Sequence, residues 1–286
     1  MSAFIAYLLS GLAIGSTFAL VGSGFVMIHR VTRVVNFAQG TFAVIGGMTT
    51  SSLLGHSLPH GAAEVVAIAV AGAVGLVVGV IAIGKPGTPT LASLIITLGL
   101  AIGAYAGEVV VFGDQPVSYQ MAPGAVTLGG AHVLWQYFVV MAVTLITFAG
   151  LGMFFARSYI GKALTACSSN PYAARLAGIS VTGMGLLAFV LGGLLGGLAG
   201  VLIAPLQPVS FDSDAVLAVN GFAAAIFGGL MEPWWALVGG LVLGVSESMI
   251  AGYVNSSYQT EVALALMLAI MVWRAARTSV AVQEVA

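Results

Sequence analysis

The chain has 286 residues, of which 60% are hydrophobic and only 6% are charged, and its formal net charge at pH 7 is −1. An ordinary soluble domain carries about 25% charged residues, so this composition excludes that class and predicts a polytopic membrane protein. A net charge near zero gives no electrostatic reason to bind nucleic acid, and the single cysteine, Cys167, excludes an internal disulfide. We therefore expect an all-α integral membrane protein with one transmembrane domain over residues 1–286.

Apolar runs long enough to cross a membrane recur along the whole chain. A bilayer core requires about 20 apolar residues per helix. The first run follows no cationic region, which favours a retained helix over a cleaved signal peptide. The seventh run is short and rich in glycine, which makes it either a broken or a re-entrant segment. The sequence predicts eight or nine transmembrane segments, at about 3–28, 35–54, 62–83, 90–112, 133–156, 181–204, 216–231, 236–252 and 260–273.

Basic residues predict the orientation of these segments. If nine segments alternate from an outside N-terminus, every Lys and Arg falls on the cytoplasmic side, as the positive-inside rule requires. We therefore expect the N-terminus outside and the C-terminus in the cytoplasm. The alternative has eight crossings and both ends in the cytoplasm, and it requires a second re-entrant piece early in the chain. The basic residues are Arg30, Arg33, Lys85, Arg157, Lys162, Arg175, Arg274 and Arg277.

Glycines repeat every four positions on several predicted segments. This spacing places them along one helix face, where they allow neighbouring backbones to pack closely in lipid. The main interpretation is helix packing, and the alternative is a pore lined by bare backbone. The repeats are Gly99/Gly103/Gly107, Gly192/Gly196/Gly200, Gly193/Gly197 and Gly240/Gly244.

The stretch 157–180 is the longest basic interruption of the apolar chain. Asn170 is a good helix N-cap, and Pro171 suits the first helical position. Gly178 suits the left-handed conformation that ends many helices. The sequence therefore predicts a short capped helix over Tyr172–Ala177 in the cytoplasm, where another protein would hold it.

Four polar residues are expected at membrane depth or just inside its edge: Asn36, Gln39, Asn220 and Glu247. Burying an unpaired carboxylate is costly, so we expect that Glu247 faces the bundle interior, is paired or is protonated. It has either a functional role or an interhelical hydrogen bond with Ser246 or Ser248. Asn36 and Gln39 lie three residues apart and either line a path or cap a helix start. These four residues are the candidates for a substrate pathway.

The remaining polar residues of the sequence form no catalytic or metal-binding motif. Glu108 lies near the predicted outer boundary, where we expect it to be solvated. His56 and His60 are four apart, but Pro59 lies between them and no third ligand is nearby, so an outer loop is expected instead of a metal site. The sequence contains no Walker loop and no catalytic triad order. We expect no enzyme activity, metal or cofactor in this chain, and any energy for work would be supplied elsewhere.

Several stretches, in order over nearly the whole chain, together resemble the inner-membrane permease subunits of branched-chain amino acid ABC transporters. The usual pattern has His where Gln39 stands. The matching stretches are Gly15–Leu20, Val35–Gly40, Leu94–Gly99, Gly161–Ile179, Phe222–Gly229 and Gly239–Glu247.

This resemblance implies a multi-pass pore half in a bacterial-type inner membrane, surrounded by lipid and paired with a second, identical or related permease. Two cytoplasmic ATPase subunits, which would carry the ATP, and an external solute-binding protein would complete an importer of branched-chain or other small amino acids or amides. The loop 157–180 would hold the coupling helix that rests on the ATPase, through Asn170, Pro171, Ala173, Ala174, Arg175, Gly178 and Ile179. The alternative is an ion-coupled secondary transporter or channel, although such carriers usually contain more intramembrane acids and bases.

Overall fold

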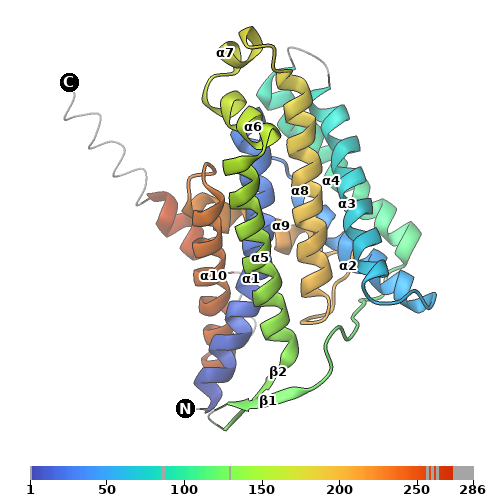
Figure 1. Ribbon diagram of the computed structural model, residues 1–286. Coiled ribbons are helices and arrows are strands. Elements are labelled where there is room, and N and C mark those ends of the chain that lie inside the picture. The colour runs from blue at the N-terminus through green and yellow to red at the C-terminus, as the bar shows by residue number, and fades with distance from the viewer. Residues whose placement is uncertain are drawn as a thin grey trace, which may run out of the picture.

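The chain folds into a bundle of long apolar helices (Figure 1). The structure is a computed structural model that describes residues 2–84, 88–128, 130–255, 258, 261 and 264–272. Within these residues, six helices are long and apolar enough to cross a membrane. They are α1 (Ser2–Thr32), α3 (Ala62–Ile83), α4 (Thr90–Phe112), α5 (Trp135–Arg157), α8 (Val181–Ile203) and α10 (Pro233–Tyr253).

Two shorter helices, α2 (Gln39–Gly55) and α9 (Ser213–Phe227), contact each other and α1. The short seventh segment of the sequence analysis corresponds to α9. The second predicted segment was expected to be helical from residue 35, but α2 begins only at Gln39, because the preceding residues form a turn in which the Gln39 N–H donates to the Asn36 carbonyl at 3.2 Å. The ninth predicted segment, 260–273, lies partly outside the described residues.

A small β-hairpin interrupts the otherwise helical chain. Strands β1 (Ala125–Leu128) and β2 (Ala131–Leu134) pair antiparallel, with Ala125 opposite Leu134. The same connection also forms a bridge between Val117 and Val209, which ties the segment after α4 to the segment after α8. Residues 133 and 134, which the sequence assigned to the start of the fifth membrane segment, belong to β2 instead. The hairpin lies beside the N-terminus of α1, at the end of the bundle opposite α7 (Pro171–Leu176) (Figure 1).

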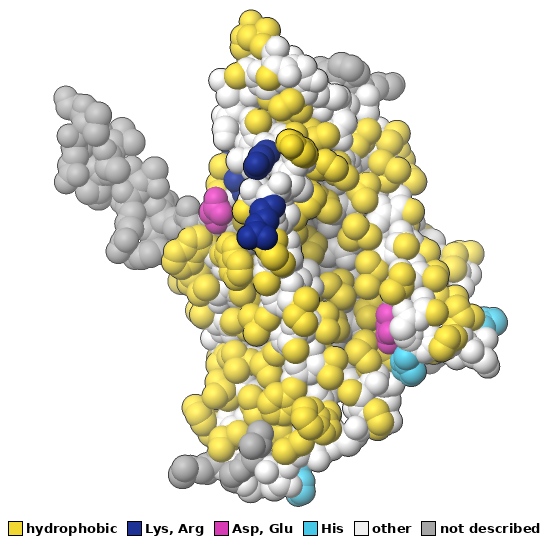
Figure 2. Space-filling model, in the orientation of Figure 1, with side chains coloured by type: hydrophobic (Ala, Val, Ile, Leu, Met, Phe, Trp, Pro, Cys, Tyr) yellow, Lys and Arg dark blue, Asp and Glu magenta, His cyan; other side chains and the backbone are white. Residues whose placement is uncertain are grey.

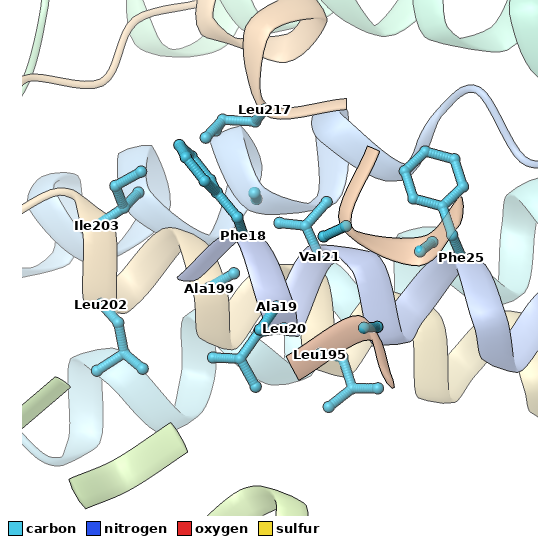
Figure 3. Close-up of a cluster of buried hydrophobic side chains, with 14 of the residues drawn as sticks. Phe18, Ala19, Leu20, Val21, Phe25, Leu195, Ala199, Leu202, Ile203 and Leu217 are labelled. Atoms are coloured by element: carbon cyan, nitrogen blue, oxygen red, sulfur yellow. The ribbon is translucent and has the colours of Figure 1, made fainter. Parts of the chain in front are cut away.

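Helix α1 forms the centre of the bundle. It contacts α8, α9 and α10 extensively and also touches α2 and α5. Its residues from Phe18 to Ile28 are buried around the whole helix circumference, as expected for a helix that is apolar on all sides. Figure 3 shows side chains of α1, α8 and α9, among them Phe18, Leu202 and Leu217, filling this core.

Glycine packing explains how the central helices approach so closely. A Cβ added at Gly240 of α10 would lie 2.6 Å from the backbone oxygen of Gly15 on α1. One added at Gly193 of α8 would lie 2.5 Å from the Ala71 oxygen on α3. The packing interpretation of the glycine repeats is therefore confirmed on α8 and α10. At Gly99, Gly103 and Gly107 of α4 an added Cβ would meet nothing within 4 Å of the described chain, so these three glycines do not pack against another described helix of this chain.

Basic side chains are concentrated at one end of the molecule (Figure 2). Figure 2 shows Lys and Arg side chains gathered in the upper part of the view, around α5 and α6 (Tyr159–Ser169), while hydrophobic side chains cover much of the surface below. We call this the basic end and define it by Arg30, Arg33, Arg157, Lys162 and Arg175. The short helix α7 lies at this end, beyond α6 (Figure 1).

Candidate coupling loop and membrane cavity

The helix α7 is capped at both ends as the sequence predicts. The Asn170 Oδ1 accepts hydrogen bonds from the backbone N–H groups of Tyr172 at 3.1 Å and Ala173 at 3.0 Å. Gly178 has a φ of 81°, in the left-handed region, and its N–H donates to the Arg175 carbonyl at 3.0 Å. The Ile179 N–H donates to the Ala174 carbonyl at 3.0 Å. This pair of bonds is a Schellman ending. The helix spans Pro171–Leu176, one residue earlier at each end than predicted.

The two faces of α7 differ in exposure. Ala174 is buried and packs in one cluster with Leu164 of α6 and with Ile179. Tyr172 and Leu176, four residues apart, are 71% and 75% exposed and lie on the outer face. Neither residue was among the candidates that the sequence suggested for this helix, although the exposed Ala173 and Arg175 were. The spacing of Tyr172 and Leu176 on so short a capped helix was the signal that could have found them.

Helix α6 was not predicted as a separate element, and it attaches the loop to the bundle. The Ser158 Oγ caps it by accepting from the Gly161 N–H at 2.8 Å. At its other end, the Arg33 Nη2 donates to the Ser168 carbonyl at 2.9 Å. Burial raises the pKa of the Cys167 thiol on the inner face, which keeps the group neutral. The loop continues into α5 at one end and α8 at the other, and the Arg30 Nε of α1 donates to the Ser168 Oγ at 3.3 Å. The loop is therefore joined to three spanning helices.

A cavity of about 370 Å³ lies among α1, α9 and α10. It is lined by both Asn220 and Glu247, which are 2% and 6% exposed as whole residues. The Asn220 side chain lies close enough to the Glu247 carboxyl group to interact with it electrostatically. Within the described residues the Glu247 Oε1 has no hydrogen-bond partner. This oxygen is therefore both buried and unpaired, which is costly unless a donor group reaches it.

The serines beside Glu247 do not bond to it, although the sequence analysis considered that possibility. The Ser248 Oγ lies 2.7 Å from the Ser10 Oγ and donates to the Tyr7 carbonyl at 2.7 Å. The Ser246 Oγ donates to the carbonyl of Val242 on its own helix at 2.8 Å. Ser248 thus makes the interhelical contact between α10 and α1, and the partner of Glu247 comes from α9 instead.

Asn36 and Gln39 lie elsewhere, at the start of α2. The Gln39 Nε2 donates to the Gly192 carbonyl on α8 at 2.9 Å. Asn36 and Gln39 are both fully buried. The Asn36 Oδ1 accepts from the Ala38 N–H at 3.2 Å, which shapes the turn before the helix. The structure therefore brings together Asn220 and Glu247 and places Asn36 and Gln39 apart from them.

A second group of buried acids was missed at the sequence level. Glu108 of α4 is only 3% exposed and interacts electrostatically with Asp214 of α9. The Thr41 Oγ1 of α2 donates to the Asp214 Oδ2 at 2.7 Å. The expectation that Glu108 is solvated is wrong, because it shares the inward face of α4 with Ser93 and Thr97. Among the described residues, no group of three or more His, Cys, Asp or Glu could hold a metal ion.

Comparison with known proteins identifies the family to which this chain belongs. The family model described as the permease component of branched-chain amino acid transport systems matches residues 7–273. The probable branched-chain amino acid transport permease protein LivH of Methanocaldococcus jannaschii is 31% identical, covering 84% of this chain and 79% of its own length. The high-affinity branched-chain amino acid transport system permease protein BraD of Pseudomonas aeruginosa is 29% identical, covering 95% and 94%.

Among solved structures, PsaBC from Streptococcus pneumoniae in complex with Fab has a similar fold, with a TM-score of 0.51, 16% identity and coverage of 94% of this chain and 91% of that one. The family match spans most of the chain, including the loop with α6 and α7 and the helices around the Glu247 cavity. The chain is a multi-pass membrane protein and belongs to the family of branched-chain amino acid transport system permease components.

Proposed function

We propose that this chain is the pore half of an ATP-driven importer of branched-chain or other small amino acids or amides, delivered by an external binding protein. Family membership supports an ABC permease subunit that works with separate ATPase subunits. The single observation that carries the coupling part of the proposal is the outer face of α7. A six-residue helix with rigid caps presents Tyr172 and Leu176 to solvent at the basic end.

Exposed apolar side chains at i and i+4 on a short helix are suited to a groove on a partner protein. Tyr172 and Leu176 would enter a groove on a cytoplasmic ATPase subunit, and Arg175 would lie beside them. Asn170, Pro171 and Gly178 would hold the helix in a fixed pose, while Ala173, Ala174 and Ile179 would support it. Closure of the ATPase pair would then move α7 as a rigid body.

The connections of the loop give this movement a route into the membrane. The loop is covalently joined to α5 and α8 and hydrogen-bonded to α1. A push on α7 would tilt these helices and change access to the cavity beside α1. Such rigid-body coupling requires that the loop be firmly attached at both ends.

The Glu247 cavity is our candidate for part of the substrate pathway. Its volume of about 370 Å³ suits a small solute. The free carboxylate oxygen of Glu247 would accept a hydrogen bond from an ammonium or amide N–H group, and the Asn220 amide would position the carboxylate. Asn36 and Gln39 would contribute indirectly, by holding the start of α2. A second permease, identical or related, would complete the path.

Coupling is tested by a matched pair of variants in the complex co-expressed with its ATPase subunits. Leu176→Glu adds a charge to the proposed contact, and we expect it to lose the co-purifying ATPase and ATP-driven uptake. Tyr159→Glu is the control, because Tyr159 is 90% exposed on α6 but lies outside the proposed contact. Normal ATPase retention and uptake by Leu176→Glu would contradict the proposed role of α7.

Substrate class is tested by uptake into proteoliposomes that contain the complete complex and the binding protein. Radiolabelled leucine, valine, small amides and a pentose sugar would be compared, with ATP inside the vesicles. We expect uptake of one or more amino acids or amides and none of the sugar. Uptake driven by an ion gradient without ATP would overturn the importer proposal.

A further inference from the structure

A second cavity, of about 320 Å³, lies at the basic end between α1, α5 and the start of α10. It does not share any of its lining residues with the Glu247 cavity. The lining includes Arg30 of α1, Phe148, Gly152 and Phe155 of α5, and Glu232 and Trp234 at the start of α10. It therefore combines two opposite charges with an apolar wall.

The two charged side chains of this cavity do not neutralise each other. Arg30 is half-buried, its Nε donates to the Ser168 Oγ at 3.3 Å, and its guanidinium carbon lies 5.6 Å from the centre of the Phe155 ring. Glu232 is exposed. Within the described part of the chain, neither residue forms an ion pair. A ligand that carries both an anionic and a cationic group would satisfy both.

The chemistry of these two charged groups restricts the class of ligand that can bind. A guanidinium group binds phosphate through directed N–H donors, and a carboxylate accepts hydrogen bonds from an ammonium group. An anion alone would bring a negative charge to the exposed Glu232. A zwitterion with a phosphate and an ammonium group in one headgroup matches the pair.

The apolar wall indicates a chain attached to that headgroup. Phe148 and Trp234 contact each other with ring centroids 5.7 Å apart. A Cβ added at Gly152 would make ordinary contact with the Trp234 ring at 3.5 Å, so the glycine leaves only a shallow, methyl-sized slot beside this ring. Trp234 is half-exposed, and tryptophan side chains are enriched where membrane lipid meets water. An acyl chain along α5 would cover this wall.

We propose that this cavity binds one phospholipid with a phosphoethanolamine headgroup. The phosphate lies on Arg30, the ammonium group on Glu232, and an acyl chain runs along α5 over Gly152 and against the exposed face of Trp234. The lipid bridges α5, which leads into α6 and α7, to α10, which carries Glu247. This site depends on membrane insertion only, so its test is independent of which solute is transported.

Native mass spectrometry of the complete complex, released from nanodiscs, measures the lipid that stays on this chain after gas-phase ejection. Nanodiscs would contain equal amounts of phosphatidylethanolamine, phosphatidylglycerol and phosphatidylcholine with identical acyl chains. We expect retention of phosphatidylethanolamine over each of the other two by about tenfold, the size of one charge-assisted hydrogen bond. A photoreactive phosphatidylethanolamine should crosslink to α5 near Gly152 and to Trp234.

Four variants test the individual contacts. Glu232→Gln should abolish the preference for phosphatidylethanolamine over phosphatidylglycerol. Arg30→Gln should lower the retention of both phosphatidylethanolamine and phosphatidylglycerol. Gly152→Leu should fill the slot and lower the retention of every lipid. Gly150→Leu is the matched control, because a Cβ at Gly150 meets nothing within 4 Å, and it should retain lipid normally. The melting temperature of each variant establishes that it is folded.

Three results would overturn the proposal. The first is equal retention of the three lipids by the unmodified chain. The second is unchanged retention in folded Arg30→Gln and Glu232→Gln variants. The third is that the photoreactive phosphatidylethanolamine fails to crosslink near Gly152 or to Trp234 in the complete complex, which would mean that a protein partner covers the site.

Discussion

Two sets of glycines with the same four-residue spacing have opposite surroundings in this protein. On α8, a Cβ added at Gly200 would overlap the backbone carbonyl of Ala43 on α2. On α4, a Cβ added at Gly103 would meet nothing within 4 Å. The spacing defines a smooth helix face in both cases, but it does not say whether another helix lies against that face. We therefore distinguish a packed centre, formed by α1, α8 and α10, from a periphery that includes α4 and the α6–α7 loop.

Acidic residues do not follow this division. Glu247 of the central α10 is buried, as the sequence predicts, and Glu108 of the peripheral α4 is buried as well. Helix α4 turns a narrow strip, with Ser93, Thr97 and Glu108, toward the bundle and leaves most of its surface exposed. A peripheral helix can therefore contribute an interior carboxylate, provided that this carboxylate lies on the single face in contact.

The largest difference in stability effect between the packed centre and the periphery is expected when a glycine is replaced. Gly200→Val should destabilise the protein by about 3 kcal/mol or more, because the new side chain overlaps backbone that cannot move aside. Gly103→Val should change stability by about 0.5 kcal/mol or less, since its side chain enters open space. Melting temperatures and size-exclusion profiles in detergent would measure both, and equal destabilisation would contradict the distinction.

A glycine in the peripheral loop is expected to matter for a different reason. Gly178 has a φ of 81°, and a left-handed backbone costs other residues about 1–2 kcal/mol, with more for a β-branched one. Gly178→Val should therefore distort the end of α7 and abolish ATP-driven uptake, while the melting temperature of the bundle stays nearly unchanged. Uptake in proteoliposomes is the measurement, and Gly178→Asn, which tolerates this conformation, should retain most of the activity.

A central and a peripheral carboxylate can be compared directly. Glu247→Gln replaces the free carboxylate oxygen of the cavity with an amide, and we expect uptake to fall by about tenfold, the effect of losing one charge-assisted hydrogen bond. Glu64→Gln serves as the control, because Glu64 lies at the start of α3 and pairs only with His60 in the described residues. If transport by Glu247→Gln is unchanged, including its pH profile, then Glu247 has only a packing role.

Replacing a serine hydroxyl should give the smallest difference in stability between the packed centre and the periphery. Ser10→Ala removes the interhelical contact to Ser248 and should lower stability by about 1 kcal/mol. Ser169→Ala removes a local bond to the Thr165 carbonyl on an exposed face and should have almost no effect. The two melting temperatures, measured under the same conditions, would decide whether the serine contact between α1 and α10 contributes to stability.

Local signals predicted much of the fold. Apolar runs located α3 at 62–83 and α4 at 90–112, because long uninterrupted hydrophobic stretches depend little on tertiary contacts. Asn170, Pro171 and Gly178 located α7, since capping is a property of a few adjacent residues. The late start of α2, the hairpin and the separate helix α6 were not predicted, because they rest on turn and pairing geometry that hydrophobicity does not encode.

Some residues of the candidate site were predicted and others were not, because contacts between distant helices are not encoded in local sequence. Glu247 and Asn220 were recognised as unusual polar residues in apolar segments, but the cavity that both line lies between different helices, α9 and α10. Tyr172 and Leu176 were overlooked because exposure, not residue type, makes them candidates for binding. Glu108 was assigned to the surface because its position along the helix was considered without the direction of its side chain.

By itself, the sequence determined the membrane class, the family, most helix positions, and the caps of α7. Each of these depends on composition or on residues a few positions apart. Only the tertiary structure decided which glycine faces are covered, which polar residues meet, and where cavities lie between α1, α5, α9 and α10. Those features depend on how helix faces meet across the bundle, and a repeat along one helix carries no information about the helix opposite it.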